Sequence, residues 1–230
     1  MAAIGISRTN VHLIKKKYQA LGKGNVRLTQ STLRLIRDID PTKSSYVFPV
    51  LENETTQVFA DEIRLAITDE FTITSMGIYL KGTLSESEGK ATQPYYFTWA
   101  PVQNSIKHAV SAGLYDGLFR LGVNNINYIE KWAVKNHEYT PAFSQFQSFI
   151  TPTSAQQPSS RYLNDAKVPF SPLVSISGAK KQEISISLPK AIDQSISSFV
   201  DNQGKTIEVA IKQIAVVFDG MLAQNSARFQ

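Results

Sequence analysis

The chain has 230 residues, enough for one large β domain or two small barrels with a buried core. It carries 24 lysines and arginines against 19 aspartates and glutamates, and it contains no cysteine, which excludes disulfides, thiolate metal sites and cysteine nucleophiles. Because only 19% of the residues are charged, below the roughly 25% of typical soluble domains, much of the surface has to be Ser, Thr, Asn and Gln or be covered by neighbouring molecules.

The formal net charge of +5 and a pI near 9.3 suit contact with nucleic acid or an anionic lipid surface, although many soluble proteins are mildly basic. No apolar run approaches the roughly 18 residues of a membrane span. The first ten residues lack the charged and apolar regions of a signal peptide. We therefore expect a soluble, unprocessed chain.

The stretch NVHLIKKKYQALGKG, residues 10–24, predicts a short amphipathic helix that Asn10 can cap and Gly22 can end. We treat residues 1–24 as an N-terminal basic arm. Its apolar stripe, expected to pack on neighbouring subunits or beneath the chain's own barrel, consists of Val11, Ile14, Tyr18 and Leu21. Its candidates for contact with anionic lipid or nucleic acid, which a solvated face would explain equally well, are Lys15, Lys16, Lys17 and Lys23.

After the arm, alternating and β-branched residues predict strands at 26–39, 45–51, 62–67, 71–80 and 94–99. Pro49 indicates that the second of these is an edge strand or contains a bulge, and is not a central strand. In EIRLAI, residues 62–67, the apolar side chains Ile63, Leu65 and Ile67 face one way. A change of parity within FTITSMGIYL, residues 71–80, predicts a β-bulge near Ser75.

An interior helix is predicted next, because five apolar residues recur at helical spacing from Ile106 to Leu121. We assign 105–122 to this helix, as a bridge between a first β subdomain, 25–104, and a second, 123–230. Further strands are expected at 126–134, 183–188, 206–211 and 214–218. The segment 190–200 is the best remaining candidate for a helix.

The residues that could carry chemistry are few and scattered. His12, His108 and His137 have no second histidine at helical or strand spacing, and Asp38 and Asp40 beside Pro41 are typical of a turn. No nucleophile elbow, phosphate-binding loop or zinc-protease motif is present. We therefore predict no catalytic, cofactor-binding or metal-binding residue, and a protein that is not an enzyme.

The segments NVHLIKKKYQALG, EIRLAI, FTITSMGIYL, PYYFTW, SIKHAVSAGLYDGLFRL, EISISL and TIEVAIKQIAVVF span nearly the whole chain. In their layout they resemble the jelly-roll major capsid protein of tailless, internal-membrane-containing bacteriophages. The resemblance implies a mainly β fold, a jelly-roll barrel with an N-terminal helix and one inserted helix. Because 230 residues are few for two full eight-stranded barrels, one elaborated barrel and two small barrels (a double jelly roll) both stay open.

The same resemblance implies a viral structural protein that self-assembles into an icosahedral shell. Its partners would be itself, as a homotrimer, other capsid proteins such as vertex proteins, and anionic membrane or genome at the inner surface, which the arm would face. Its location would be the virion, assembled in the host cytoplasm. One alternative is a β-rich nucleic-acid-binding or accessory virion protein, and a third interpretation is a carbohydrate-binding or hydrolytic β-domain.

Overall fold

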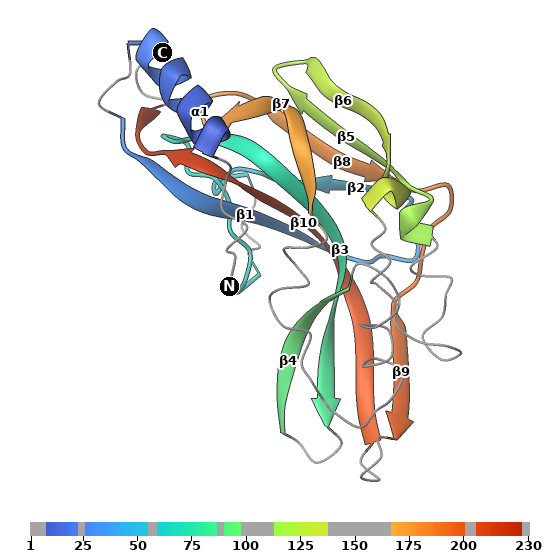
Figure 1. Ribbon diagram of the computed structural model, residues 1–230. Coiled ribbons are helices and arrows are strands. Elements are labelled where there is room, and N and C mark those ends of the chain that lie inside the picture. The colour runs from blue at the N-terminus through green and yellow to red at the C-terminus, as the bar shows by residue number, and fades with distance from the viewer. Residues whose placement is uncertain are drawn as a thin grey trace.

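A computed structural model of the chain describes residues 8–22, 26–54, 59–86, 90–97, 113–137, 167–200 and 206–226. Its regular elements, shown in Figure 1, are helix α1 (Arg8–Ala20), strands β1 (Leu28–Asp38), β2 (Ser45–Phe48), β3 (Glu70–Glu86), β4 (Lys90–Phe97), β5 (Leu118–Val123) and β6 (Ile126–Ala133), the 3-10 helix η1 (Val134–His137), and strands β7 (Val168–Ser177), β8 (Gln182–Ser187), β9 (Ser195–Val200) and β10 (Thr206–Ala223). The predicted mainly β class is confirmed.

The described strands form two antiparallel sheets. In the first sheet, the long strands β3 and β10 pair along nearly their whole length. One half of this pair is flanked by β1 and β7, in the order β1-β10-β3-β7, and the other half by β9 and β4, in the order β9-β10-β3-β4. The second sheet has the order β2-β8-β5-β6. It stacks on the β1-β10-β3-β7 half, and the β9-β10-β3-β4 half extends beyond it (Figure 1).

The eight strands of the stacked half follow a jelly-roll order. When these eight strands are renumbered 1 to 8 in chain order, leaving out β4 and β9, the order in the first sheet is 1-8-3-6 and the order in the second is 2-7-4-5. The chain therefore passes between the sheets as in a double-sheet jelly roll. Each sheet contains strands from both 25–104 and 123–230. The described strands of the two proposed subdomains therefore share one sandwich, and they do not form two separate barrels.

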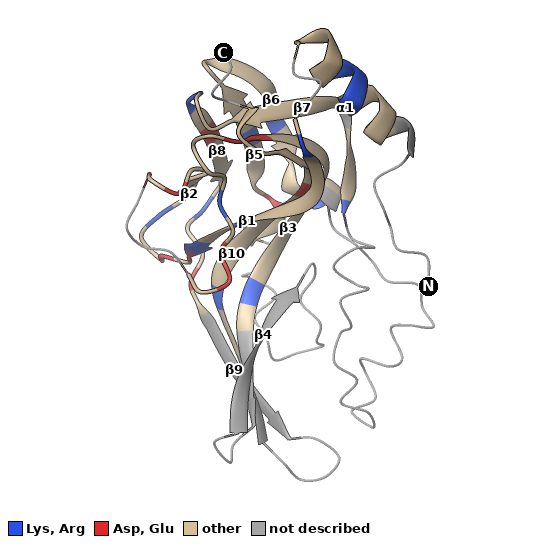
Figure 2. Cartoon of the chain, turned by 90° about the vertical axis from the view of Figure 1, so that its left-hand side faces the viewer, with Lys and Arg blue, Asp and Glu red and all other residues tan. Residues whose placement is uncertain are grey.

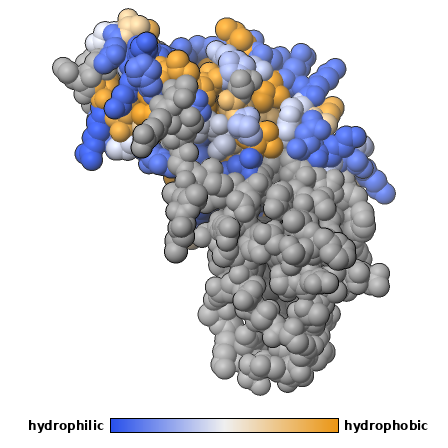
Figure 3. Space-filling view, in the orientation of Figure 1, coloured by the Kyte–Doolittle hydropathy of each residue, from blue (hydrophilic) through white to orange (hydrophobic). Residues whose placement is uncertain are grey.

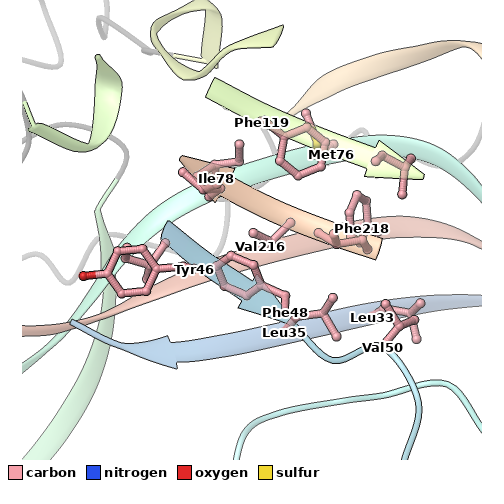
Figure 4. Packing of buried hydrophobic residues seen from close by; sticks show 14 of the residues in the cluster. Leu33, Leu35, Tyr46, Phe48, Val50, Met76, Ile78, Phe119, Val216 and Phe218 are labelled. Atoms are coloured by element: carbon pink, nitrogen blue, oxygen red, sulfur yellow. The ribbon is translucent and has the colours of Figure 1, made fainter. Parts of the chain in front are cut away.

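The core lies between the two sheets, because alternate side chains of each strand point to the facing sheet. Phe119 of β5 packs against Phe218 of β10, with ring centroids 6.5 Å apart, and against Trp132 of β6, edge to face. Figure 4 shows buried side chains from both sheets meeting in this layer: Leu33, Leu35, Tyr46, Phe48, Val50, Met76, Ile78, Phe119, Val216 and Phe218.

The predicted bulge near Ser75 is confirmed, and the extra residue is Thr74. The pairing of β3 with β10 passes from Ile73 opposite Gly220 to Ser75 opposite Asp219. The extra residue resets the alternation, so that residues of opposite parity before and after it both face the core. Gly220 is required here, because a Cβ at this position would lie 2.0 Å from the Thr72 carbonyl oxygen.

The prediction that residues 62–67 form an alternating strand is wrong. Of its three apolar residues only Leu65 is buried, whereas 43% of Ile63 and 51% of Ile67 are exposed. Ile63 and Leu65 form only isolated bridges, to β1 and to Leu51. The reason is that the segment runs along the outer side of β1, where its alternation presents the charged residues Glu62 and Arg64 to the protein.

Glu62 and Arg64 form a buried ion pair on this outer side. Arg64 Nη2 lies 2.9 Å from Glu62 Oε2, and the two side chains are 2% and 0% exposed. The other Glu62 oxygen accepts a hydrogen bond from the Ile36 backbone N–H at 3.2 Å. A second pair, Lys81 with Asp61 at 2.7 Å, anchors the neighbouring residue. These charges hold the segment 59–65, which we call the strap, against the first sheet.

Two predicted helices are corrected in their described parts. Residues 105–112 of the bridging helix lie outside the described residues and 113–115 are helical, but 118–122 belong to β5. Residues 195–200 of the other candidate form β9, which pairs with β10. In both segments the apolar spacing fits either period, and hydrogen bonding to neighbouring strands decides the outcome.

Replacing Arg64 by Ala should lower the free energy of unfolding by about 3–5 kcal/mol, because it leaves the Glu62 carboxylate buried without its cation. The double variant Glu62→Gln, Arg64→Met should lose less, since the neutral amide still accepts the Ile36 hydrogen bond. Urea denaturation of both variants checks this. Equal losses in the two variants would contradict a charge-based role for the pair.

Candidate basic surface on the first sheet

Helix α1 packs on the outer face of the first sheet at the end where β10 finishes. Ile14 and Tyr18 are 1% and 2% exposed and cluster with Met221 and Ala223 of β10. Around them lie further apolar side chains from α1, from β1 and the residues just before it, and from β7: Val11, Val26, Leu28 and Leu173. Since a helix of about a dozen residues is marginal alone in water, this contact stabilises α1.

Three of the four residues predicted as the apolar stripe therefore pack on the chain's own sheet. The fourth, Leu21, is 56% exposed. The helix ends at Ala20, so Leu21 lies beyond the last helical residue, in the turn that continues through Gly22 with a φ of 72°. Leu13, on the helix itself, is also 51% exposed. The described stripe thus consists of Val11, Ile14 and Tyr18.

Polar groups under one side of the helix tie it to β7 and β3. Lys17 Nζ donates a hydrogen bond to Ser175 Oγ at 2.5 Å, and Ser175 in turn shares one with Thr72 at 2.8 Å. Close by, Glu70 is buried and accepts a hydrogen bond from Ser226 Oγ at 3.1 Å. The side chain of Lys17 is consequently engaged within the chain, unlike that of a lysine pointing to solvent.

Lys15 and Lys16 are exposed on the outward side of α1, beside His12 and Leu13. Lys23 lies outside the described residues. Figure 2 shows basic residues on α1, and in Figure 3 hydrophobic and hydrophilic side chains are mixed over this end of the molecule. The surface that α1 presents is therefore basic with single apolar side chains. It can attract anions by charge, and the attraction is screened by salt.

The rest of this outer face was not predicted from the sequence. Between the strap and α1, the Asp219 carboxylate forms an ion pair with Lys167 and accepts hydrogen bonds from Thr32 at 2.8 Å and Ser75 at 3.5 Å. These residues come from β10, β1 and β3 and from the position just before β7. Only strand register brings them together, so no local pattern could have indicated the cluster. The polar groups of this cluster bind one another, which indicates that the cluster stabilises the fold.

The residues considered as ligands in the sequence have structural partners. Asp40 accepts hydrogen bonds from the Thr42 backbone and hydroxyl and pairs with Lys43 at 2.9 Å, and these contacts hold the pKa of its carboxyl well below the usual range. Asp38 accepts one from Gln213 at 2.9 Å. Among the described residues no three His, Asp or Glu side chains lie close enough together to hold a metal.

Comparisons with family models, with curated proteins and with solved structures found no match to this chain. In the part of the chain that the structure describes, no helix is long and apolar enough to cross a membrane.

Replacing Ile14 by Ala should weaken the docking of α1, because a buried Ile→Ala substitution typically costs 2–5 kcal/mol and Ile14 is 1% exposed. The matched control is Leu13→Ala, one residue earlier and half exposed, for which we expect a change within about 0.5 kcal/mol. Hydrogen exchange of the α1 amides, followed by mass spectrometry, measures the docking. Equal protection in the two variants would argue against the contact.

Burial, and secondly the Glu70 carboxylate, raise the pKa of Tyr18 above its usual value of about 10. The folded chain thus holds this proton more tightly than the unfolded chain, so the stabilising contribution is complete below pH ~10 and is lost as the pH rises further. Above pH ~10 the free energy of unfolding should fall more steeply for the wild type than for Tyr18→Phe, by up to about 1.4 kcal/mol per pH unit. Parallel curves would contradict this account.

Proposed function

We propose that the chain is a viral structural protein, the major capsid protein of an icosahedral shell, whose arm α1 lies on the inner surface. The observation that carries the proposal is the jelly-roll strand order with a basic helix docked on one outer face. Double-sheet jelly rolls of eight strands are found in viral capsid proteins, and also in lectins and cupins. Because a fold alone does not determine a function, the surfaces have to distinguish these classes.

The interior of the sandwich favours a structural role over a ligand-binding one. The space between the sheets is filled by large apolar side chains, such as Phe48, Phe119 and Phe218, each at most 1% exposed. A carbohydrate-binding or hydrolytic jelly roll needs converging polar groups in a cleft. Among the described residues, the buried polar groups instead serve the strap, the Asp219 cluster, the contacts under α1 and the turn between β7 and β8. The proposal accordingly assigns no catalytic residue and no cofactor.

The arm supports an inner-surface role. Its helix is fixed by Ile14 and Tyr18, so Lys15 and Lys16 are held on one side of the molecule. Oriented lysines of this kind attract anionic lipid or nucleic acid, each contributing about 1 kcal/mol at an anionic membrane surface. The shell would be built from homotrimers with other capsid proteins such as vertex proteins, in virions assembled in the host cytoplasm.

A second candidate function is a nucleic-acid-binding accessory virion protein, which the outward lysines of α1 also favour. The two functions differ in self-association. Light scattering and negative-stain electron microscopy of the purified full chain, at rising concentration and in the presence of anionic vesicles or DNA, should show trimers or shells if the capsid proposal holds. A monomer that binds oligonucleotide at every concentration would overturn it in favour of the second function.

The double variant Lys15→Gln, Lys16→Gln should bind anionic vesicles or DNA about 30-fold more weakly at low salt, from roughly 1 kcal/mol for each lysine. The difference from the wild type should shrink as salt rises. Lys131→Gln, an exposed lysine of β6 in the second sheet, is the control and should bind like the wild type. Co-sedimentation measures the binding. Unchanged binding of the double variant would mean that these lysines are only solvated.

A further inference from the structure

The outer face of the second sheet differs from that of the first, because no described element covers it. Its outward residues alternate with buried ones along β2, β5 and β8. The register places Ser45, Ser187 and Leu118 in one row across the sheet, and Val47, Ser185 and Arg120 in the next. The central strand β8 thus carries two serines between exposed apolar side chains, Val47 at 60% and Leu118 at 41% exposure.

An ion pair joins β5 to β8 on this face. Arg120 Nη1 of β5 is 3.1 Å from Glu183 Oε1 of β8, and the two side chains are 41% and 44% exposed. Arg120 also donates from Nε and Nη2 to Asn127 Oδ1 of β6, which fixes the guanidinium. On a solvated surface such a pair contributes little to stability, typically 0–1 kcal/mol. Its arrangement matters more for recognition than for folding.

We propose that this face is a contact between two copies of the chain, packed sheet to sheet about a two-fold axis. An axis parallel to the face and passing between Arg120 and Glu183 would bring each arginine over the glutamate of the other copy. This ion pair is therefore self-complementary across such an axis. The serines of the face are small enough to let two sheets approach, and Val47 and Leu118 supply the apolar area that such a contact would remove from water.

The size of the face sets the strength of the contact. Four strands about 4.8 Å apart, with about five residues each at 3.4 Å, give a face of roughly 15 by 17 Å. The area of the face, about 250 Å² from these two lengths, is well below the roughly 800 Å² that each partner buries in a stable interface. A single contact is therefore weak and depends on concentration, and it becomes effective when many copies are linked. In this respect the inference rests on the proposed self-assembly.

Charge reversal tests the inference on the full chain. Arg120→Glu puts two carboxylates on each face and Glu183→Arg puts two cations there, so each variant should self-associate at least about tenfold more weakly than the wild type. An equal mixture of the two variants should associate again, and so should the double variant Arg120→Glu, Glu183→Arg, whose face is again self-complementary. Sedimentation velocity over a wide concentration range measures the dissociation constants.

Two further variants keep the test decisive. Lys212→Glu, an exposed lysine of β10 in the first sheet, makes the same charge change as Arg120→Glu and should associate like the wild type. Ser185→Gln adds an uncharged, larger side chain at the centre of the face, so it leaves the net charge of the pair unchanged, and it should weaken association even if one reversal variant fails to fold. Wild-type association that neither reversal nor Ser185→Gln changes would overturn this face and leave self-assembly standing. A wild type that is monomeric at all concentrations would overturn both.

Discussion

The antiparallel pairing of β3 with β10 is the contact on which the rest of the structure depends. Every other strand of the first sheet is hydrogen-bonded to one of these two: β1 and β9 to β10, and β4 and β7 to β3. Their inward side chains, among them Met76, Ile78, Val216 and Phe218, form the floor on which the second sheet packs. Because the paired residues are far apart in the sequence, this ladder also closes a long loop, and its formation carries a large entropic cost.

The same ladder determines what the outer face of the first sheet can hold. The alternation of β10 places every second residue on the outer side, where these residues form three neighbouring zones. Val217 and Ala215 lie under the strap, Asp219 lies at the bulge, and Met221 and Ala223 receive α1. The orientation of the arm lysines is therefore a consequence of strand register in the middle of the sheet. A shift of β10 by one residue would turn Met221 and Ala223 toward the core and remove the apolar surface on which α1 packs.

The sequence indicates those features that depend on near neighbours in the chain. The arm, its end at Gly22 and the bulge near Ser75 follow from local period and parity, as do most of the strands. The strap, β9 and the start of β5 could not be predicted in this way, because their outcome depends on which distant strand offers a hydrogen bond or a countercharge. Of the candidate site, the sequence identified the lysines and the buried Ile14 and Tyr18. It could not show that Leu21 is exposed or that Arg120 meets Glu183.

The two outer faces of the sandwich differ in how their contacts respond to salt. Lys15 and Lys16 stand in solvent on the covered face, where attraction to an anionic surface decays over about 10 Å at 0.1 M salt. Arg120 and Glu183 would instead be enclosed between two sheets, where charges are screened much less. Copies joined through the second sheet would thus stay associated at salt concentrations that release the arm from lipid or nucleic acid. The contact between subunits and the binding of the arm to lipid or nucleic acid would then respond separately to salt, because the two surfaces lie on opposite sides of one core.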